Sequence, residues 1–164
     1  MTASIEEIER RLRIMEDIEE IKQLHVRYLD AYGTFNVPVI MESFARDAVA
    51  DVRPAGDLIC KGKKEIEKMF LENFNMANPP RKLPMDARFA VHPLITVTGD
   101  TAKAKWTYYH LHSHPRTCQS LFWIQGIYTV DLVREDGRWK FNYLKWRPSL
   151  GMQLGTPPYE GMDS

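Results

Sequence analysis

The spacing of apolar residues changes once along the chain, and this change restricts the possible folds more than any other feature of the sequence. In residues 4–33, apolar side chains recur at intervals of three and four, which predicts amphipathic helix. In residues 88–147, apolar and polar residues roughly alternate, which predicts strands with hairpin turns at Gly99-Asp100 and at Glu135-Asp136-Gly137. Helices followed by a meander of long antiparallel strands indicate an α+β fold, with helices on one face of a curved sheet.

The first half of the chain predicts several helices. Because about thirty residues are long for one helix of a globular protein, we expect two helices at about 4–15 and 17–32, with Gly33 as a left-handed C-cap. The sequence then predicts a helix over 37–46 with Pro38 in its first turn, a brief strand over 47–52, a turn at 54–56, a helix over 63–74 that starts after Gly62, and a loop over 77–84.

The composition fits one domain and excludes several classes of function. The chain has 164 residues, with 22 basic and 22 acidic side chains and a formal net charge of +0, which argues against nucleic acid or an anionic membrane as a partner. We expect a single domain over 1–164, with a core at about 14–147 and an irregular C-terminal extension at 148–164. The sequence shows no apolar run that could span a membrane, no secretory signal and only two cysteines, so a cytoplasmic protein is expected.

The alternation within each predicted strand indicates which side chains share a face. In residues 101–114, Lys103 and Lys105 should face water, and the opposite face should carry Ala102, Ala104, Trp106, Tyr108, His110, His112 and His114. The next strand should present Phe122, Ile124, Gly126, Tyr128, Val130 and Leu132 on its more apolar face, and the last strand Trp139, Phe141 and Tyr143. One stripe of the second helix carries Ile21, Leu24, His25, Tyr28 and Tyr32.

These faces predict an aromatic pocket. Walls of Trp, Tyr, Phe and His suit a planar or polycyclic organic ligand, because they bury a large area and their polar tips orient the ligand. Asn142 would turn toward this pocket only if the last strand bulges. The residues expected to bind substrate are Trp106, Tyr108, Phe122, Tyr128, Asn142 and Trp146.

Five segments in the same order resemble the SnoaL-like branch of the NTF2-like superfamily. They are IEEIKQLHVRYLDAY, FARDAVADV, KGKKEIEKMF, VTGDTAKAKW and QGIYTVDLVREDGRWKF, which together run from about residue 18 to residue 141. The resemblance implies a cone, in which a strongly bent antiparallel sheet wraps a deep pocket and N-terminal helices close its wide side. It also implies association into homodimers, commonly through the outer face of the sheet, or into higher homo-oligomers. Enzymes of this kind include scytalone dehydratase, bile-acid 7α-dehydratase, a dehydrochlorinase, ketosteroid isomerase and polyketide cyclases, and most need no cofactor.

The chain departs from the catalytic pattern that the resemblance implies. The family commonly uses an Asp–His pair with a tyrosine, and Tyr28 matches that tyrosine, but Gly33 stands near the place of the aspartate and Arg88 at the place of the histidine. Asp30 could substitute for the acid, His110 or His112 could supply the base, and a buried Arg88 would favour an oxyanion such as a phenolate or carboxylate. The candidate catalytic residues are Tyr28, Tyr32, His110, His112, Arg88 and Asp30.

Together these features predict a cofactor-independent lyase that acts by acid–base catalysis on a hydroxylated aromatic or polycyclic small molecule. Elimination of water and elimination of formaldehyde, as in the breakdown of lignin-derived compounds, both stay open. An isomerase or cyclase, a non-catalytic ligand-binding module and an auxiliary subunit of a ring-hydroxylating oxygenase are alternatives. His110, His112 and His114 alternate along one strand face and could meet an ion, but no carboxylate partner is placed beside them, so no functional metal is expected.

Overall fold

The computed structural model describes residues 4–52, 59–76, 86–113 and 121–155. Its elements are α1 (Ile5–Gly33), α2 (Val37–Glu42), β1 (Phe44–Val52), β2 (Ile59–Lys61), α3 (Gly62–Met76), β3 (Asp86–Thr98), β4 (Thr101–Ser113), β5 (Leu121–Glu135) and β6 (Arg138–Gly155). The predicted α+β class is confirmed. The predicted turn at 54–56, the loop at 77–84, and the side chains of His114 and Cys118 lie outside the described residues.

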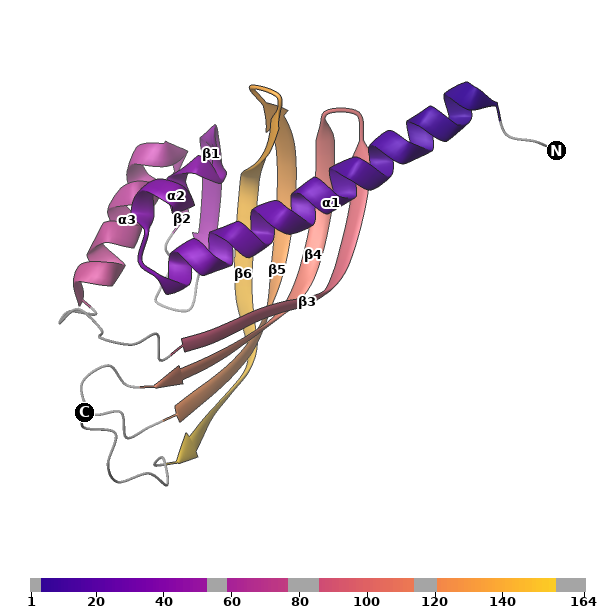
Figure 1. The fold of residues 1–164 in the computed structure, drawn as a ribbon. Helices are drawn as coiled ribbons and strands as arrows, with labels where there is room; N and C mark the ends of the chain where they lie inside the picture. The colour runs from indigo at the N-terminus through magenta and orange to yellow at the C-terminus, as the bar shows by residue number, and fades with distance from the viewer. Residues whose placement is uncertain (1–3, 53–58, 77–85, 114–120, 156–164) are drawn as a thin grey trace.

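The six strands form one sheet in the order β2-β1-β6-β5-β4-β3. The meander from β3 to β6 is antiparallel, as predicted, whereas β1 joins the sheet by pairing parallel to β6. Figure 1 shows the strands bending strongly below α1, which crosses one side of the sheet, while α2 and α3 lie beside β1 and β2. The short strand β2 has no counterpart in the sequence predictions.

One straight helix replaces the two helices predicted over 4–33. α1 is capped by Ser4, whose hydroxyl accepts a hydrogen bond from the backbone N–H of Glu7, and it continues without interruption to Gly33. Its middle is held by Asp17, whose carboxylate pairs with Arg134 of β5 and accepts a hydrogen bond of 3.1 Å from Nε1 of Trp139 in β6. The prediction of a break was wrong: the apolar spacing continues from Met15 to Ile18, helix extension is cooperative, and the contacts of Asp17 hold the middle of the helix against the sheet.

Asp17→Ala is expected to lower the free energy of unfolding by about 2 kcal/mol, because it leaves the Arg134 guanidinium and the Trp139 N–H without their shared acceptor. Urea unfolding followed by tryptophan fluorescence measures this loss. Glu16→Ala removes an exposed carboxylate from the neighbouring position of α1 and should change the stability by a few tenths of that amount. Equal losses in both variants would contradict the anchoring role of Asp17.

The predicted boundaries shift at two further places. α2 ends at Glu42 rather than at residue 46, because β1 begins at Phe44 and its first residues pair with β6. Gly33 is not a left-handed C-cap, since it is the last helical residue of α1 and the left-handed residue of the following turn is Phe35, with φ 57°. The predicted helix over 63–74 is confirmed as α3, and Gly62 at its start has φ 76°, a conformation that glycine adopts without strain.

The last strand corrects two predictions. Residues 148–155 continue β6 and pair with β5, so the extension predicted as irregular is strand up to Gly155, and residues 156–164 lie outside the described chain. Leu132 pairs with Phe141 and Asp131 pairs with Tyr143, which leaves Asn142 as one extra residue in β6. This bulge reverses the alternation. Tyr143 therefore leaves the face of Phe141, and its hydroxyl donates to Asp51 at 2.9 Å.

The faces predicted for β4 and β5 are confirmed over residues 102–108 and 126–132, whereas the side chains of His112, His114 and Phe122 lie outside the described part of the structure. On β4, Ala102, Ala104, Trp106 and Tyr108 are buried and Lys103 and Lys105 are exposed; on β5, Gly126, Tyr128, Val130 and Leu132 are buried. These inward residues pack against Ile21, Leu24 and Tyr28 of α1 and form the core. None of the helices in the described ranges is long and apolar enough to cross a bilayer.

Candidate active site

Four tyrosines from three elements gather on the inner face of the sheet. Tyr28 and Tyr32 lie one turn apart on α1, with ring centroids 6.3 Å apart, and Tyr108 and Tyr128 come from neighbouring strands, with centroids 5.1 Å apart. Tyr28 and Tyr128 meet edge to face at 6.4 Å. Together, Tyr28, Tyr32, Tyr108 and Tyr128 form a tyrosine cluster.

The tyrosine cluster keeps its inner hydroxyls protonated. Burial raises the pKa of Tyr28, and the neighbouring Tyr32 and Tyr108 raise it further. Burial also raises the pKa of Tyr128 well above its ordinary value, and a side-chain hydrogen bond joins Tyr128 to Tyr28. A buried, protonated phenol can donate a hydrogen bond to negative charge that develops on a substrate oxygen.

Arg88 of β3 reaches the outer end of the tyrosine cluster. The carbon at the centre of its guanidinium lies 4.5 Å from the centroid of the Tyr32 ring, a cation–π contact, and the positive charge counteracts the rise in the pKa of Tyr28. A Cβ placed on Gly33 would lie 3.2 Å from Nη1 of Arg88. The two positions at which the chain departs from the Asp–His pair therefore lie side by side, and glycine leaves the space into which the guanidinium fits.

Gly33→Ala is expected to change stability and activity in opposite directions. Gly33 is the last helical residue of α1, where alanine has a higher helix propensity than glycine by at most about 0.5–1 kcal/mol, but the added methyl group would displace Nη1 of Arg88. Thermal unfolding should therefore show a stability that is unchanged or higher, and kcat/KM should fall by about tenfold. Unaltered kinetics would show that the position of the Arg88 guanidinium beside Gly33 has no part in the reaction.

The structure brings several other predicted residues to the same place. His110 is directly opposite Arg88 in the β3–β4 register and is half-buried, with its ring 6.1 Å from that of Tyr108. Trp106, two residues before Tyr108 on the same face of β4, is buried. Trp146 meets Tyr108 edge to face at 6.2 Å, and a Cβ on Gly126 would lie only 2.6 Å from its Nε1, so the indole requires glycine at this position of β5.

Two predicted residues lie outside the site, and for two others the structure does not describe the side chain. Asp30 is exposed on α1, and Asn142 is exposed at the bulge of β6 even though the strand does bulge. His112 and Phe122 pair with each other across β4 and β5, but their side chains lie outside the described part of the structure. Among the described residues, no group of three His, Cys, Asp or Glu side chains could hold a metal ion.

One buried polar residue was missing from the predicted site. His25 is 1% exposed, and its ring stacks on Trp106 with centroids 4.1 Å and planes 12° apart. Burial lowers the pKa of His25 to about 3, so the ring is neutral at physiological pH. The sequence placed His25 on the stripe of Tyr28, and a histidine at an inward position of a core helix is the signal that could have added it to the site.

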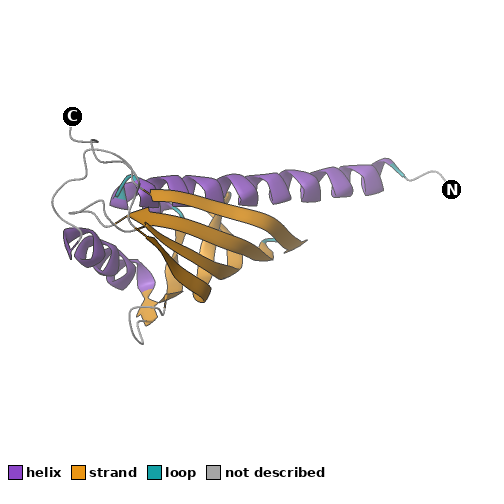
Figure 2. Cartoon of the chain, turned by 90° about the horizontal axis from the view of Figure 1, so that it is seen from below, coloured by secondary structure: helices purple, strands orange, loops and turns teal. Residues whose placement is uncertain are grey.

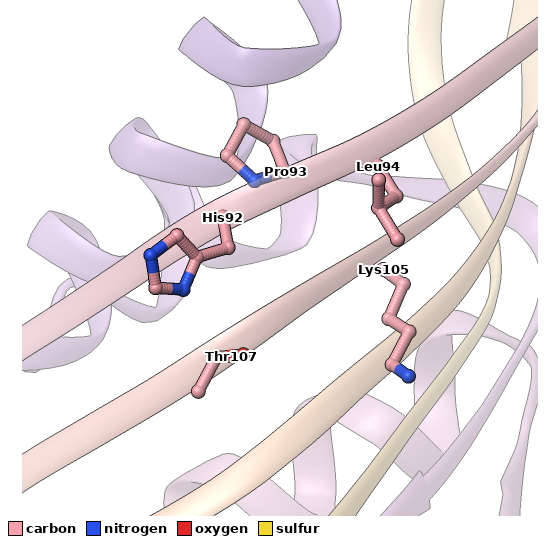
Figure 3. A pocket seen from close by; sticks show the side chains of 5 residues that line it. All are labelled: His92, Pro93, Leu94, Lys105 and Thr107. Carbon is pink, nitrogen blue, oxygen red and sulfur yellow. The ribbon is translucent and has the colours of Figure 1, made fainter.

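A second depression lies away from these residues. Figure 3 shows His92, Pro93 and Leu94 of β3 beside Lys105 and Thr107 of β4, which line a pocket of about 240 Å³. Lys105 and Thr107 alternate with Trp106 and Tyr108, so this pocket opens on the outer face of the sheet. It shares no lining residue with the tyrosine cluster and carries no part of the candidate site.

The family model of the SnoaL-like domain matches residues 13–145. No curated protein matches the chain significantly.

Several solved structures have the same fold as this chain. A candidate scytalone dehydratase from Novosphingobium aromaticivorans has 14% identity and a TM-score of 0.72, covering 92% of this chain and 95% of its own. An NTF2-like protein from the same organism has 21% identity and a TM-score of 0.67, and the match covers 89% of this chain and 90% of that protein. A hexachlorocyclohexane dehydrochlorinase from Novosphingobium barchaimii has 18% identity and a TM-score of 0.71, and the match covers 92% of this chain and 97% of that protein. These structures share the NTF2-like fold, and because the family model covers most of its length, the chain belongs to the SnoaL-like family.

Proposed function

We propose that the protein is a cofactor-independent lyase that eliminates a small molecule, such as water or formaldehyde, from a hydroxylated aromatic compound. The observation that carries the proposal is the position of the Arg88 guanidinium, beside Tyr32 and within electrostatic reach of the protonated Tyr28. A cation and a phenolic donor at one end of an aromatic face suit a planar substrate with a phenolate, enolate or carboxylate oxygen.

The residues have complementary roles in a dehydration. Arg88 and Tyr28 would hold the substrate oxygen on which negative charge accumulates, and Tyr108 and Trp146 would contact the ring of the substrate. His110 would take a proton from a substrate carbon, the electron pair of that C–H bond would form a double bond, and the C–O bond to the leaving hydroxyl would break. The proton on His110 would then pass to the leaving oxygen and release water, so the enzyme returns to its starting state.

Two further observations support a lyase. The inner face provides a donor, a cation and a histidine in one place, which is the set that a proton transfer with charge stabilisation needs. The dehydrochlorinase and the candidate dehydratase that share the fold are both named for eliminations. A place in the breakdown of aromatic compounds would follow from the aromatic lining.

Tyr28→Phe tests the proposal. A panel of hydroxylated aromatic compounds is screened for loss of water or formaldehyde, and the variant is expected to lose about a hundredfold in kcat on the compound that is turned over. Tyr109→Phe is the matched control, because Tyr109 lies on the opposite face of β4 beside Trp123, and its kinetics should not change. Unchanged turnover in Tyr28→Phe would place the chemistry elsewhere.

A non-catalytic ligand-binding module is the second candidate function. The Gly33–Arg88 contact favours it, because a glycine and an anion-binding guanidinium stand where the resemblance implies an acid–base pair. Such a module would bind phenolate or carboxylate compounds without converting them. Calorimetric titration beside product analysis separates the two functions, since only the lyase yields a product.

A further inference from the structure

His25 is a polar residue that the proposed function leaves unused. Neither of its ring nitrogens has a hydrogen-bond partner among the described residues, although the side chain is 1% exposed. Aromatic rings surround it: Trp106 stacks on one face, and Tyr128 and Phe141 approach edge-on, with centroids at 5.2 Å and 5.9 Å. A buried polar atom without a partner costs free energy, so each one in a folded protein requires an explanation.

Packing alone does not explain a histidine here. An apolar ring or a leucine would fill the same space between Trp106 and Phe141 without burying two polar atoms. Trp146 Nε1 is a second buried donor without a partner in the described ranges. Ring contacts run from His25 through Tyr128 and Tyr108 to Trp146, so both groups belong to one aromatic layer that includes the candidate site.

We propose that His25 binds the ligand of this site, with its neutral imidazole forming a hydrogen bond to a hydroxyl or carbonyl oxygen, directly or through one water. The ligand would then be held at two ends. Its anionic oxygen would lie at Arg88, and its neutral oxygen would lie one helical turn deeper than Tyr28, at His25. This inference rests on the proposed site at the tyrosine cluster, and it specifies the substrate class as an aromatic compound with two separated oxygen groups.

The first measurement needs no ligand. His25→Phe and His25→Leu remove both nitrogens and keep an apolar side chain, so both variants should unfold at the same temperature as the natural chain or higher. A clear fall in the unfolding temperature of both variants would mean that the imidazole has a structural role, and would overturn the inference.

The second measurement uses phenol, catechol, para-hydroxybenzoate and naphthol as probes. Nitrogen NMR of the histidine ring should show a shift of the His25 signals on binding of at least one probe with two oxygen groups, and His25→Phe should weaken that binding about tenfold. Val26→Ala, on the exposed side of the same turn, should bind normally.

Unchanged His25 signals across the panel would overturn the inference. If Tyr28→Phe abolishes turnover while His25→Phe binds and reacts normally, the proposed function stands and this inference fails. If Tyr28→Phe reacts normally while His25→Phe loses binding of the probe, the proposed function fails and this inference stands.

A different observation concerns the first half of α1. Figures 1 and 2 show this half projecting beyond the sheet. Ile5, Ile8, Leu12 and Met15 form a stripe along it at intervals of three, four and three, with exposed fractions of 76%, 54%, 54% and 67%. Leu12 and the buried Ile21 are nine residues apart, which is about two and a half helical turns, so the stripe faces away from the core.

The side of this half that faces the body of the protein is charged. Arg10 and Asp17 line a groove of about 860 Å³ there, together with Asp100 and Arg134 of the sheet. The helix is therefore apolar on its outer side and polar toward its own sheet, the reverse of a helix that covers a monomeric domain. We infer that the stripe pairs with the same stripe of a second copy of the chain, in parallel.

The charges beside the stripe determine this direction. With Ile5 and Leu12 at the first core position of a heptad and Ile8 and Met15 at the second, Arg11 and Glu16 flank the core on its two sides. In a parallel pair, Arg11 of one copy lies opposite Glu16 of the other, whereas an antiparallel pair brings like charges together. Because each stripe faces away from its own sheet, the two folded bodies lie on the outside and do not collide.

Sedimentation velocity over a range of protein concentrations tests this pairing. The natural chain should dimerise with rising concentration, Leu12→Glu should stay monomeric, and Leu71→Glu, at a 46% exposed leucine of α3, should dimerise normally. Arg11→Glu and Glu16→Arg should each weaken the dimer, and the double variant should restore it. A monomer at all concentrations, a dimer that Leu12→Glu leaves intact, or a double variant as weak as the single ones would overturn the inference.

Discussion

Arg88→Met is expected to lower kcat/KM by about a thousandfold on a substrate with an ionised oxygen, the largest loss we expect from one substitution in this protein. Methionine keeps an unbranched chain that can pack on Tyr32, but it removes the positive charge beside Tyr28 and Gly33. The loss should appear in KM as well as in kcat, because the guanidinium holds the ionised oxygen of the bound substrate and also stabilises charge on it during the reaction.

Arg88→Lys and a neutral substrate analogue serve as controls for this prediction. Lysine keeps the charge but loses the planar group that lies over Tyr32, so its activity should fall between the other two proteins. A substrate analogue whose ionisable oxygen is methylated should react equally slowly with all three proteins. If Arg88→Met acts equally on both compounds, the guanidinium supports the structure of the site rather than binding the oxyanion.

His25→Phe is expected to remove a large part of the acid sensitivity of the fold. Burial lowers the pKa of His25 from 6.5 to about 3 in the folded protein, whereas the unfolded chain takes up this proton near the ordinary pKa. Between these two values the unfolded state binds more protons, so the free energy of unfolding decreases as the pH falls, by up to about 1.4 kcal/mol per pH unit from this residue. Above the ordinary pKa both states are neutral, and His25 makes no pH-dependent contribution.

Urea unfolding of the natural chain and of His25→Phe between about pH 7 and pH 4 measures this difference. The two curves of unfolding free energy against pH should run parallel near neutral pH and diverge below the ordinary pKa of histidine. Near pH 4 the loss of unfolding free energy should be about 3 kcal/mol smaller in the variant than in the natural chain. The carboxylates titrate in both proteins and cancel in the comparison. Parallel curves throughout would mean that the folded protein protonates His25 normally, against its burial among Trp106, Tyr128 and Phe141.

The inward faces of β4 and β5 could be predicted from the sequence alone. Strand side chains alternate strictly, so the exposed lysines at 103 and 105 place Trp106 and Tyr108 on the buried face. The same rule failed on β6, because the extra residue at Asn142 is defined by pairing with β5 and has no sequence signal of its own. Tyr143 moved to the other face for this reason.

The length of α1 shows a similar limit. Local spacing predicts helix throughout 4–33, but the anchoring of the unbroken helix at Asp17 involves Arg134 and Trp139, which are more than a hundred residues away in the sequence. A local argument from helix length could not include that contact. The extension of β6 to Gly155 likewise depends on pairing with β5 and not on the intrinsic preferences of a segment rich in Gly and Pro.

The sequence by itself determined the α+β class, the aromatic inner faces and the family, because periodicity and motif order depend only on the order of residues. Only the tertiary structure decided that Gly33 leaves space for Arg88, that Asp30 and Asn142 stay outside, and that His25 is buried without a partner in the described chain. These facts concern distances between residues far apart in the chain, and such distances arise only when the helix and the sheet pack together.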